Sequence, residues 1–88
     1  MSVFVRAEIL GKVPNGLTHN EVFATINSVI RERVTNVQSV TKRRLAGGFV
    51  SVIAEFEAVN ETIANNEARY AGQSVTGFSF DAMVRVRP

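Results

Sequence analysis

The composition of this 88-residue chain is that of one small folded domain. Hydrophobic residues make up 45% of it and charged residues 20%, with six glycines and two prolines. These proportions exclude a disordered tail, a collagen-like repeat and a low-complexity linker. Because a chain of this length has room for only one hydrophobic core, we expect a single domain that spans residues 1–88.

The residue types also limit the chemistry. The chain has no cysteine and one histidine, His19. Disulfides, thiolate metal sites and multi-histidine zinc centres are therefore excluded, and we expect neither a metal nor a cofactor. Apolar runs are only a few residues long, and the N-terminus lacks a charged region followed by an apolar stretch. We therefore expect a cytoplasmic protein with no membrane partner.

The net charge carries little information about partners. Ten Lys and Arg residues stand against eight Asp and Glu, which gives a formal net charge of +2. Such a mildly basic balance is too small to indicate nucleic-acid binding by itself.

Alternation of apolar and polar residues predicts a strand from Ser2 to Leu10. Its inward side carries Val3, Val5, Ala7 and Ile9. Residues 11–16 contain Pro14 and the pair Asn15–Gly16. We expect a loop there, because glycine tolerates positive φ and proline extends neither a helix nor a ladder.

A helix is predicted over residues 18–34. Thr18 and Glu21 have the capping-box spacing, in which each side chain accepts a hydrogen bond from a free backbone N–H at the helix start. Arg31 and Arg33 near the end suit the negative pole of the helix dipole. The apolar stripe at helical spacing consists of Val22, Phe23, Ile26, Val29 and Ile30.

Two extended runs separated by Gly47–Gly48 predict a β-hairpin. Asn36 can take a left-handed turn before the first run, residues 37–45. The apolar residues of that run do not share one face, so we place it at a sheet edge and leave its register open. The second run, residues 49–57, alternates cleanly, and its inward side carries Val50, Val52, Ala54 and Phe56.

A short helix and a last strand complete the chain. Asn60 is a candidate N-cap, and alanines at helical spacing lead to Gly72, where we expect the helix to end. From Ser74 to Arg87 the chain alternates again, which predicts a strand that ends at Pro88.

The predicted element order is βαββαβ. Right-handed crossovers fold this order into a four-stranded antiparallel sheet with strand order 4-1-3-2 and both helices on one face. The fold class is therefore α+β, the ferredoxin-like plait.

The other sheet face stays uncovered and mixes large apolar groups with charges. A contiguous apolar patch usually marks a partner site, and the simplest partner is a second copy related by a two-fold axis. The alternative to a partner site is that these apolar side chains are scattered singly, as they are on many protein surfaces. We expect apolar anchors near the centre, with charged neighbours that set the register. The predicted partner-binding residues are Phe4, Arg6, Glu8, Phe49, Ile53, Met83 and Arg85.

Nucleic acid is an alternative partner. The run Lys42, Arg43, Arg44 precedes the glycine pair and the strand that begins at Phe49. This segment resembles the third strand of RNA-recognition domains, where aromatic rings stack on bases. The resemblance implies weak binding of single-stranded RNA or DNA by these four residues. Gly47 stands where a second ring belongs, and we expect Arg85 at the opposite end of the sheet. We therefore favour a solvated edge strand whose charges discourage aggregation.

A small-molecule sensor is a second alternative. The loop Pro14–Leu17 lies between the first strand and the first helix, and the hairpin of residues 37–57 follows the helix. This arrangement resembles ACT regulatory domains, which carry a glycine-containing loop at that place. The resemblance implies binding of a small ligand such as an amino acid.

The chain lacks the residues of enzymes that share this topology. Lys12 stands where acylphosphatase-type loops carry an arginine, and Asp81 is the only aspartate. His19 is expected in solvent on the first helical turn. We therefore expect no catalytic residues and no enzyme, but an interaction module that self-associates or docks to a larger protein through its open sheet face. Many short phage and mobile-element proteins, accessory proteins or inhibitors, are of this kind.

Overall fold

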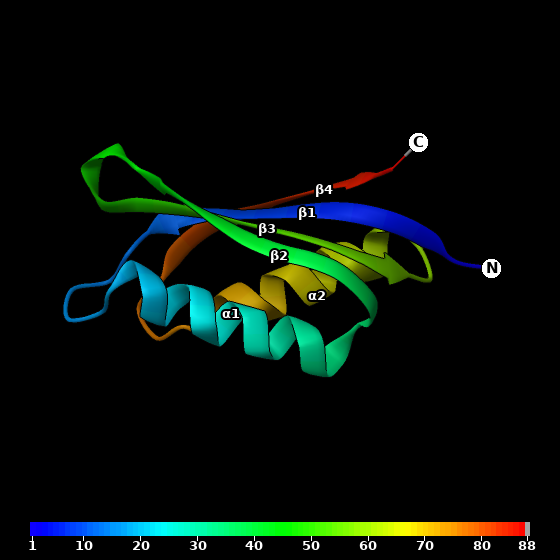
Figure 1. Ribbon diagram of the computed structural model, residues 1–88, viewed down its shortest axis with the longest axis horizontal. Helices are drawn as coiled ribbons and strands as arrows, with labels where there is room; N and C mark the ends of the chain where they lie inside the picture. Colours follow the sequence, from blue (N-terminus) through cyan, green and yellow to red (C-terminus); the bar gives the residue numbers. More distant parts are fainter. Residues whose placement is uncertain (88) are drawn as a thin grey trace.

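Four strands and two α-helices make up the fold in the computed structural model, which describes residues 1–87 (Figure 1). In chain order they are β1 (Val3–Lys12), α1 (His19–Arg33), β2 (Thr35–Leu45), β3 (Phe49–Ala58), α2 (Glu61–Gln73) and β4 (Ser79–Val86). Neighbouring strands are antiparallel and lie in the order β2-β3-β1-β4. The predicted ferredoxin-like fold and strand order are confirmed.

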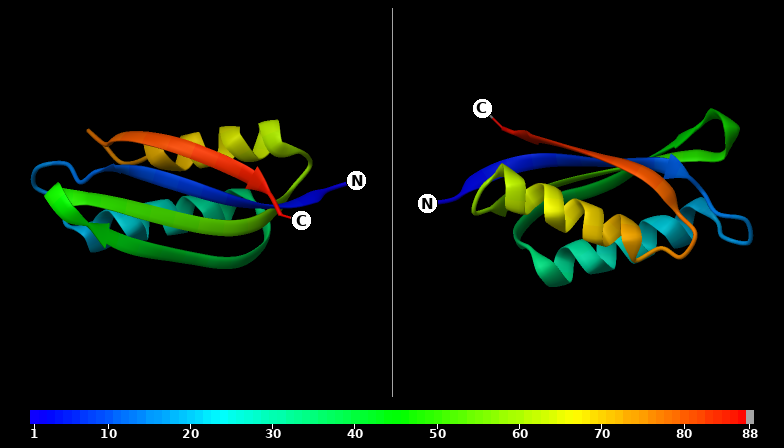
Figure 2. Two further views of the ribbon diagram at one scale, coloured as in Figure 1. Left: turned by 90° about the horizontal axis from the view of Figure 1, so that it is seen from above. Right: turned by 180° about the vertical axis from the view of Figure 1, so that it is seen from behind.

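Both helices lie on one side of the sheet, so the fold has two layers (Figure 2). The core fills the space between them. Its fully buried side chains include Val5, Ala7, Ile9, Val22, Ile26, Ile30, Val50, Val52, Ala54, Phe56, Ala64, Ala68 and Ala71. Partly buried against this core are Val3, Phe80, Ala82 and Val84. Alternation in the strands and helical spacing in the helices correctly predict these inward positions.

The predicted caps are present at the starts of both helices. Thr18 Oγ1 accepts a hydrogen bond from the Glu21 N–H at 3.1 Å, and Glu21 Oε1 accepts one from the Thr18 N–H at 2.9 Å. At the second helix, Asn60 Oδ1 accepts a hydrogen bond from the Ile63 N–H at 2.9 Å. Asn36 has a φ of 51°, the expected left-handed conformation, but it lies inside β2, which begins two residues before the predicted start at residue 37. Local sequence therefore sets where the two helices begin.

Strand β1 continues through Gly11, where a loop was predicted. Gly11 is buried and pairs in register with Val50 on β3 and Phe80 on β4. A Cβ atom at this position would lie 2.4 Å from the carbonyl oxygen of Ser79. This glycine allows β4 to approach closely, so the predicted loop of residues 11–16 was wrong at Gly11 and Lys12 and is confirmed at residues 13–16.

Strand β4 begins five residues later than predicted. Ser74 ends α2 as its C-cap, and its N–H donates to the carbonyl oxygen of Tyr70 at 3.1 Å. Gly77 has a φ of 77°, a turn conformation. The alternation between Ser74 and Phe78 therefore belongs to a turn, in which Phe78 is buried by packing and not by strand pairing. Pro88, the expected end of the last strand, lies outside the described residues.

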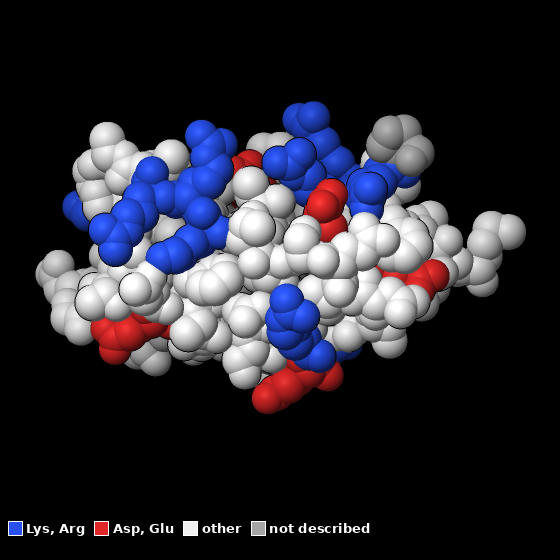
Figure 3. Space-filling view, in the orientation of Figure 1, with Lys and Arg blue, Asp and Glu red and all other residues white. Residues whose placement is uncertain are grey.

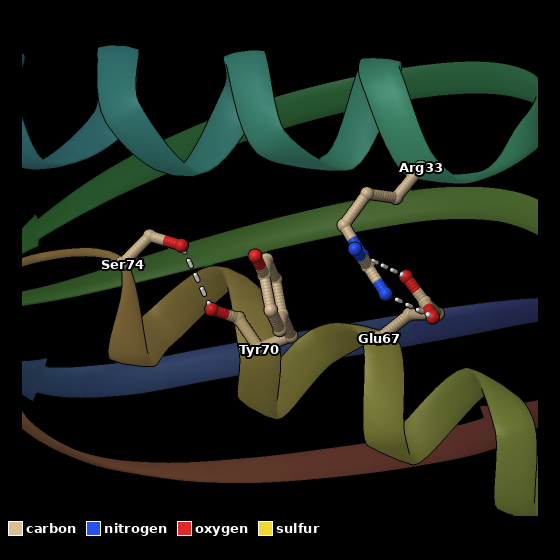
Figure 4. Close-up of polar contacts among 4 residues, drawn as sticks. All are labelled: Arg33, Glu67, Tyr70 and Ser74. Carbon is tan, nitrogen blue, oxygen red and sulfur yellow. Dashed lines mark hydrogen bonds and ion pairs between the residues drawn. The ribbon is translucent and has the colours of Figure 1, made fainter.

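A charged contact joins α1 to α2 (Figure 4). Arg33 Nε lies 2.7 Å from Glu67 Oε2, and Arg33 Nη2 lies 3.2 Å from Glu67 Oε1. The guanidinium also stacks over the Tyr70 ring, 3.8 Å from its centroid. The hydrogen bond to Glu67 raises the pKa of Arg33 above its ordinary value. The contact holds the helix layer together on the side of the molecule opposite the uncovered sheet face.

Candidate partner-binding face

The sheet face turned away from both helices is the open face. Its side chains alternate with those of the core, and residues paired in register form levels across the sheet. Three levels cross its middle: Arg43–Ser51–Leu10–Asp81, Thr41–Ile53–Glu8–Met83 and Ser39–Glu55–Arg6–Arg85. Figure 3 shows that most Lys and Arg side chains on the side in view gather along the sheet, away from the helices.

A hollow of about 310 Å³ lies in the middle of the open face. It is lined by Arg6, Glu8, Arg43, Ile53, Met83 and Arg85. Five of these six are predicted partner-binding residues. The hollow therefore collects charged groups from β1, β2 and β4 around two apolar side chains.

The remaining two predicted anchors do not join this hollow. Phe4 is level with Glu57 and Phe49 is level with Lys12, so the two rings lie eight residues apart along the central strands. At a rise of about 3.4 Å per residue the separation is roughly 27 Å. The apolar groups thus do not form the contiguous central patch that we expected, because charged residues of β1 and β3 lie between them.

Hydroxyl groups orient two acidic side chains of the open face, Glu8 and Glu55. Ser51, only 1% exposed, donates from Oγ to Glu8 Oε2 at 2.5 Å. Ser39 Oγ donates to Glu55 Oε1 at 3.2 Å, and Arg87 Nε lies 3.6 Å from Glu55 Oε2. The carboxylates are therefore held by groups of the same face.

The arginines of the hollow have no such partners. Within residues 1–87, Arg6 and Arg43 make no ion pair or side-chain hydrogen bond, and the polar contact of Arg85 is to the sulfur of Met83 at 4.0 Å. Arg6 also lies directly opposite Arg85 in register. Like charges in directly opposed cross-strand positions destabilise a sheet. The open face thus keeps one pair of opposed like charges, Arg6 and Arg85, and a third cation, Arg43, opposite a serine.

The residues of the nucleic-acid alternative are divided between the two faces. Lys42 points to the helix side, where its Nζ donates to Asn20 Oδ1 and lies 5.9 Å from the centroid of the Phe23 ring. Arg44 is level with the inward-facing Val50 at the hairpin end. Arg43 lines the hollow, and Phe49 is 42% exposed on the open face.

Arg43 and Arg85 were expected at opposite ends of the sheet, and this expectation was wrong. Both side chains line the same hollow. The hairpin pairs Leu45 with Phe49, so counting back two residues along β2 places Arg43 opposite Ser51. Counting outward from the glycine pair could have given this register from sequence. Leu10, 37% exposed, was missed because the first strand was ended there, although the alternation Glu8, Leu10, Lys12 continues.

His19 differs from its expected position in solvent. The residue is half-buried, and its Nε2 atom is buried without a hydrogen-bond partner among the described residues. Among residues 1–87, no three His, Asp or Glu side chains converge in a way that could hold a metal ion. None of the helices in this part of the chain is both long and apolar enough to span a bilayer.

The strand order and the two helices on one face define a ferredoxin-like α+β fold, which comparison with known structures also shows. The chain is similar to the ACT domain from GTP pyrophosphokinase of Chlorobium tepidum, with a TM-score of 0.61, 17% identity, and 93% and 86% of the two chains covered. It is also similar to the uncharacterized protein TM1266 from Thermotoga maritima, with a TM-score of 0.60, 8% identity and 98% of each chain covered.

A de novo designed protein, Foldit4, has the same arrangement, with a TM-score of 0.55, 13% identity and complete coverage of both chains. No family model and no curated protein matches the sequence. At these identities the similarities show the fold alone, so function has to be argued from the open face.

Proposed function

We propose that this protein is a non-enzymatic interaction module that binds a protein partner through its open face. The observation that supports the proposal is that Arg6, Arg43 and Arg85, which make no ion pair within residues 1–87, surround Ile53 and Met83 on the sheet face turned away from both helices. Arginine and methionine are enriched in protein interfaces, and lysine is depleted. A partner that supplies carboxylates would remove the repulsion that the free chain carries.

Apolar side chains of the open face would supply most of the affinity. Met83 is 55% exposed and Phe49 42%. Burying apolar surface contributes about 25 cal/mol per Å² before the costs of association. The arginines would then select the partner and set its orientation. A cytoplasmic location belongs to this proposal, as does an accessory role in which the module docks to and inhibits a larger enzyme.

A pull-down with two matched variants tests the proposal. Met83→Lys places a new charge on the open face, and Ile63→Lys places the same charge on α2, where Ile63 is 43% exposed. We expect wild type and Ile63→Lys to retain the same co-purifying protein, a second copy or another chain, and Met83→Lys to lose it. Equal capture by all three proteins, or a wild type that neither captures a protein nor self-associates, would contradict the proposal.

Single-stranded nucleic acid is a second candidate, because the hollow unites three cations and Phe49 lies exposed on the same face. Neutralising three phosphates gives a slope of about −2 for the logarithm of the binding constant against the logarithm of salt concentration. Filter binding to oligonucleotides would show this slope, and Arg43→Ala would reduce it by about one third. No binding at low salt removes this candidate.

A small-molecule sensor is a third candidate. A pocket of about 410 Å³ lies beside Leu17, at the end of the loop that resembles ACT domains. It is lined by Leu17, Glu21, Ala24, Thr25, Ser74, Val75 and Thr76. A thermal-shift assay with amino acids at millimolar concentration would raise the unfolding midpoint if such a ligand binds in this pocket, and an unchanged midpoint excludes it.

A further inference from the structure

On the open face, some basic and acidic residues lie at matching positions on either side of the sheet's midline, which runs between β1 and β3. Arg43 on β2 and Asp81 on β4 belong to the same level, on the two edge strands. Two levels further along, Arg6 on β1 is level with Glu55 on β3, on the two central strands. Arg43 and Arg6 thus each have an acidic position at the same level and at the same distance from the midline, on the other side, whereas the position that matches Arg85 is occupied by Ser39.

A two-fold axis parallel to the strands turns this pattern into complementarity between two copies. If the axis runs along the midline between β1 and β3, β2 of one copy stacks on β4 of the other, and β1 stacks on β3. Residues of the same level then face each other across the contact. Arg43 then faces the partner's Asp81, and Arg6 faces the partner's Glu55. Sheets stacked face to face lie about 10 Å apart, a gap that the long arginine side chain can bridge.

An axis perpendicular to the strands does not achieve this match. It stacks each strand on its own copy, so Arg43 would face residues of β2. That strand, Thr35–Leu45, contains no Asp or Glu. Arg43 would remain unpaired, as in the free chain. Of the two axes, only the parallel one gives a carboxylate to both Arg43 and Arg6; it places the third arginine, Arg85, opposite the partner's Ser39.

The open face has the area that such a contact needs. Four strands about 4.8 Å apart and eight residues of about 3.4 Å rise give a rectangle of about 500 Å² per copy. Two copies would bury about 1,000 Å², the lower limit of a specific interface. The resulting dimer is therefore concentration-dependent and weakened by salt.

We propose, building on the proposed function, that the partner of the open face is a second copy of this chain. The two sheets stack about a two-fold axis parallel to β1 and β3. Arg43 pairs with the partner's Asp81 and Arg6 with the partner's Glu55. In this arrangement each copy supplies carboxylates to two of the three unpaired arginines of the other.

Charge reversal tests this pairing by sedimentation equilibrium from micromolar to millimolar concentration. We expect the wild type to dimerise, and Arg43→Asp and Asp81→Arg each to weaken the dimer at least about tenfold, because each creates two like-charge pairs. The double variant R43D/D81R, and an equimolar mixture of the two single variants, would recover dimerisation. This recovery also excludes misfolding as the cause of the loss.

Arg44→Asp is the matched control for Arg43→Asp. It makes the same change of net charge on the same strand, but its side chain lies on the other side of β2, so dimerisation should persist. A wild type that is monomeric throughout, or a double variant that fails to recover, overturns the inference. The proposed function would survive that result if Met83→Lys still abolished capture of a different protein.

Discussion

Gly11 and Ser79 lie so close together that a side chain on residue 11 would collide with the backbone of the neighbouring strand. The carbonyl oxygen of Ser79 is 2.4 Å from the position of a Cβ atom on residue 11, and two atoms of the Phe78 ring are 2.8 Å from it. The backbone carbonyl cannot move aside without breaking the pairing of β1 with β4. The absence of a side chain at Gly11 is therefore what lets the second edge strand complete the sheet.

Replacing this glycine should destabilise the protein. We expect Gly11→Ala to lower the free energy of unfolding by at least about 2 kcal/mol, because β4 must shift away. Gly72→Ala is the control: its Cβ would meet the Phe80 ring at 2.5 Å, but a ring can move and alanine favours the helix by about 1 kcal/mol. Urea unfolding should therefore rank Gly11→Ala as the more harmful change, and the reverse order would contradict this account.

The capping box of α1 gives a second test of stability. Thr18→Ala removes the acceptor for the Glu21 N–H, so we expect a loss of about 1 kcal/mol in unfolding free energy. Thr18→Ser keeps the hydroxyl and should stay close to wild type. Equal losses for the two variants in urea unfolding would show that the hydroxyl hydrogen bond does not stabilise the helix start.

The lowered pKa of Glu57 predicts how the free energy of unfolding depends on pH. Hydrogen bonds from the Ser2 hydroxyl and, at 2.5 Å, from Asn36 Nδ2 hold the pKa of Glu57 below its ordinary value of 4.5. Because the folded pKa lies below the unfolded one, the stabilisation is present above about pH 4.5 and is lost as the pH falls through the folded value.

The double variant Ser2→Ala/Asn36→Gly tests this sign. Glycine keeps the left-handed conformation at residue 36, so the variant chiefly removes the two donors. A carboxyl ¹³C titration should show the pKa of Glu57 raised toward 4.5. The variant should be less stable than wild type at about pH 7, with a smaller difference at about pH 2.5. The same stability difference at both pH values would refute the assignment.

Most of the fold can be predicted from the sequence because its signals are local. The alternation in β1 and β3, the Thr18 and Asn60 caps and the glycine pair at the hairpin each act over a few residues. The errors arise where distant segments decide. Glycine is typical of loops, but Gly11 lies in a strand, where the missing side chain leaves room for β4. The residues after Ser74 alternate like a strand but form a turn, in which Gly77 has a positive φ.

The open face could be predicted only in part, for the same reason. Alternation assigns Arg6, Glu8 and Met83 to the face, but not to a common level, which depends on cross-strand register. The register of β2 is also shifted between Thr35 and Ser39, where Asn36 has a positive φ. The position of Arg43 opposite Ser51 follows from counting back along the hairpin, but its level with Asp81 depends on the register of β4 and comes only from the structure.

The accessibility of the Met83 methyl group tests most directly whether the open face is the contact surface. The chain has two methionines, so selective ¹³C-methyl labelling gives two signals, and Met1 serves as the exposed reference. With a soluble paramagnetic agent at high protein concentration, we predict strong relaxation of Met1 and protection of Met83, and loss of that protection in Arg43→Asp. Equally strong relaxation of Met83 in wild type and in the variant would contradict a covered open face.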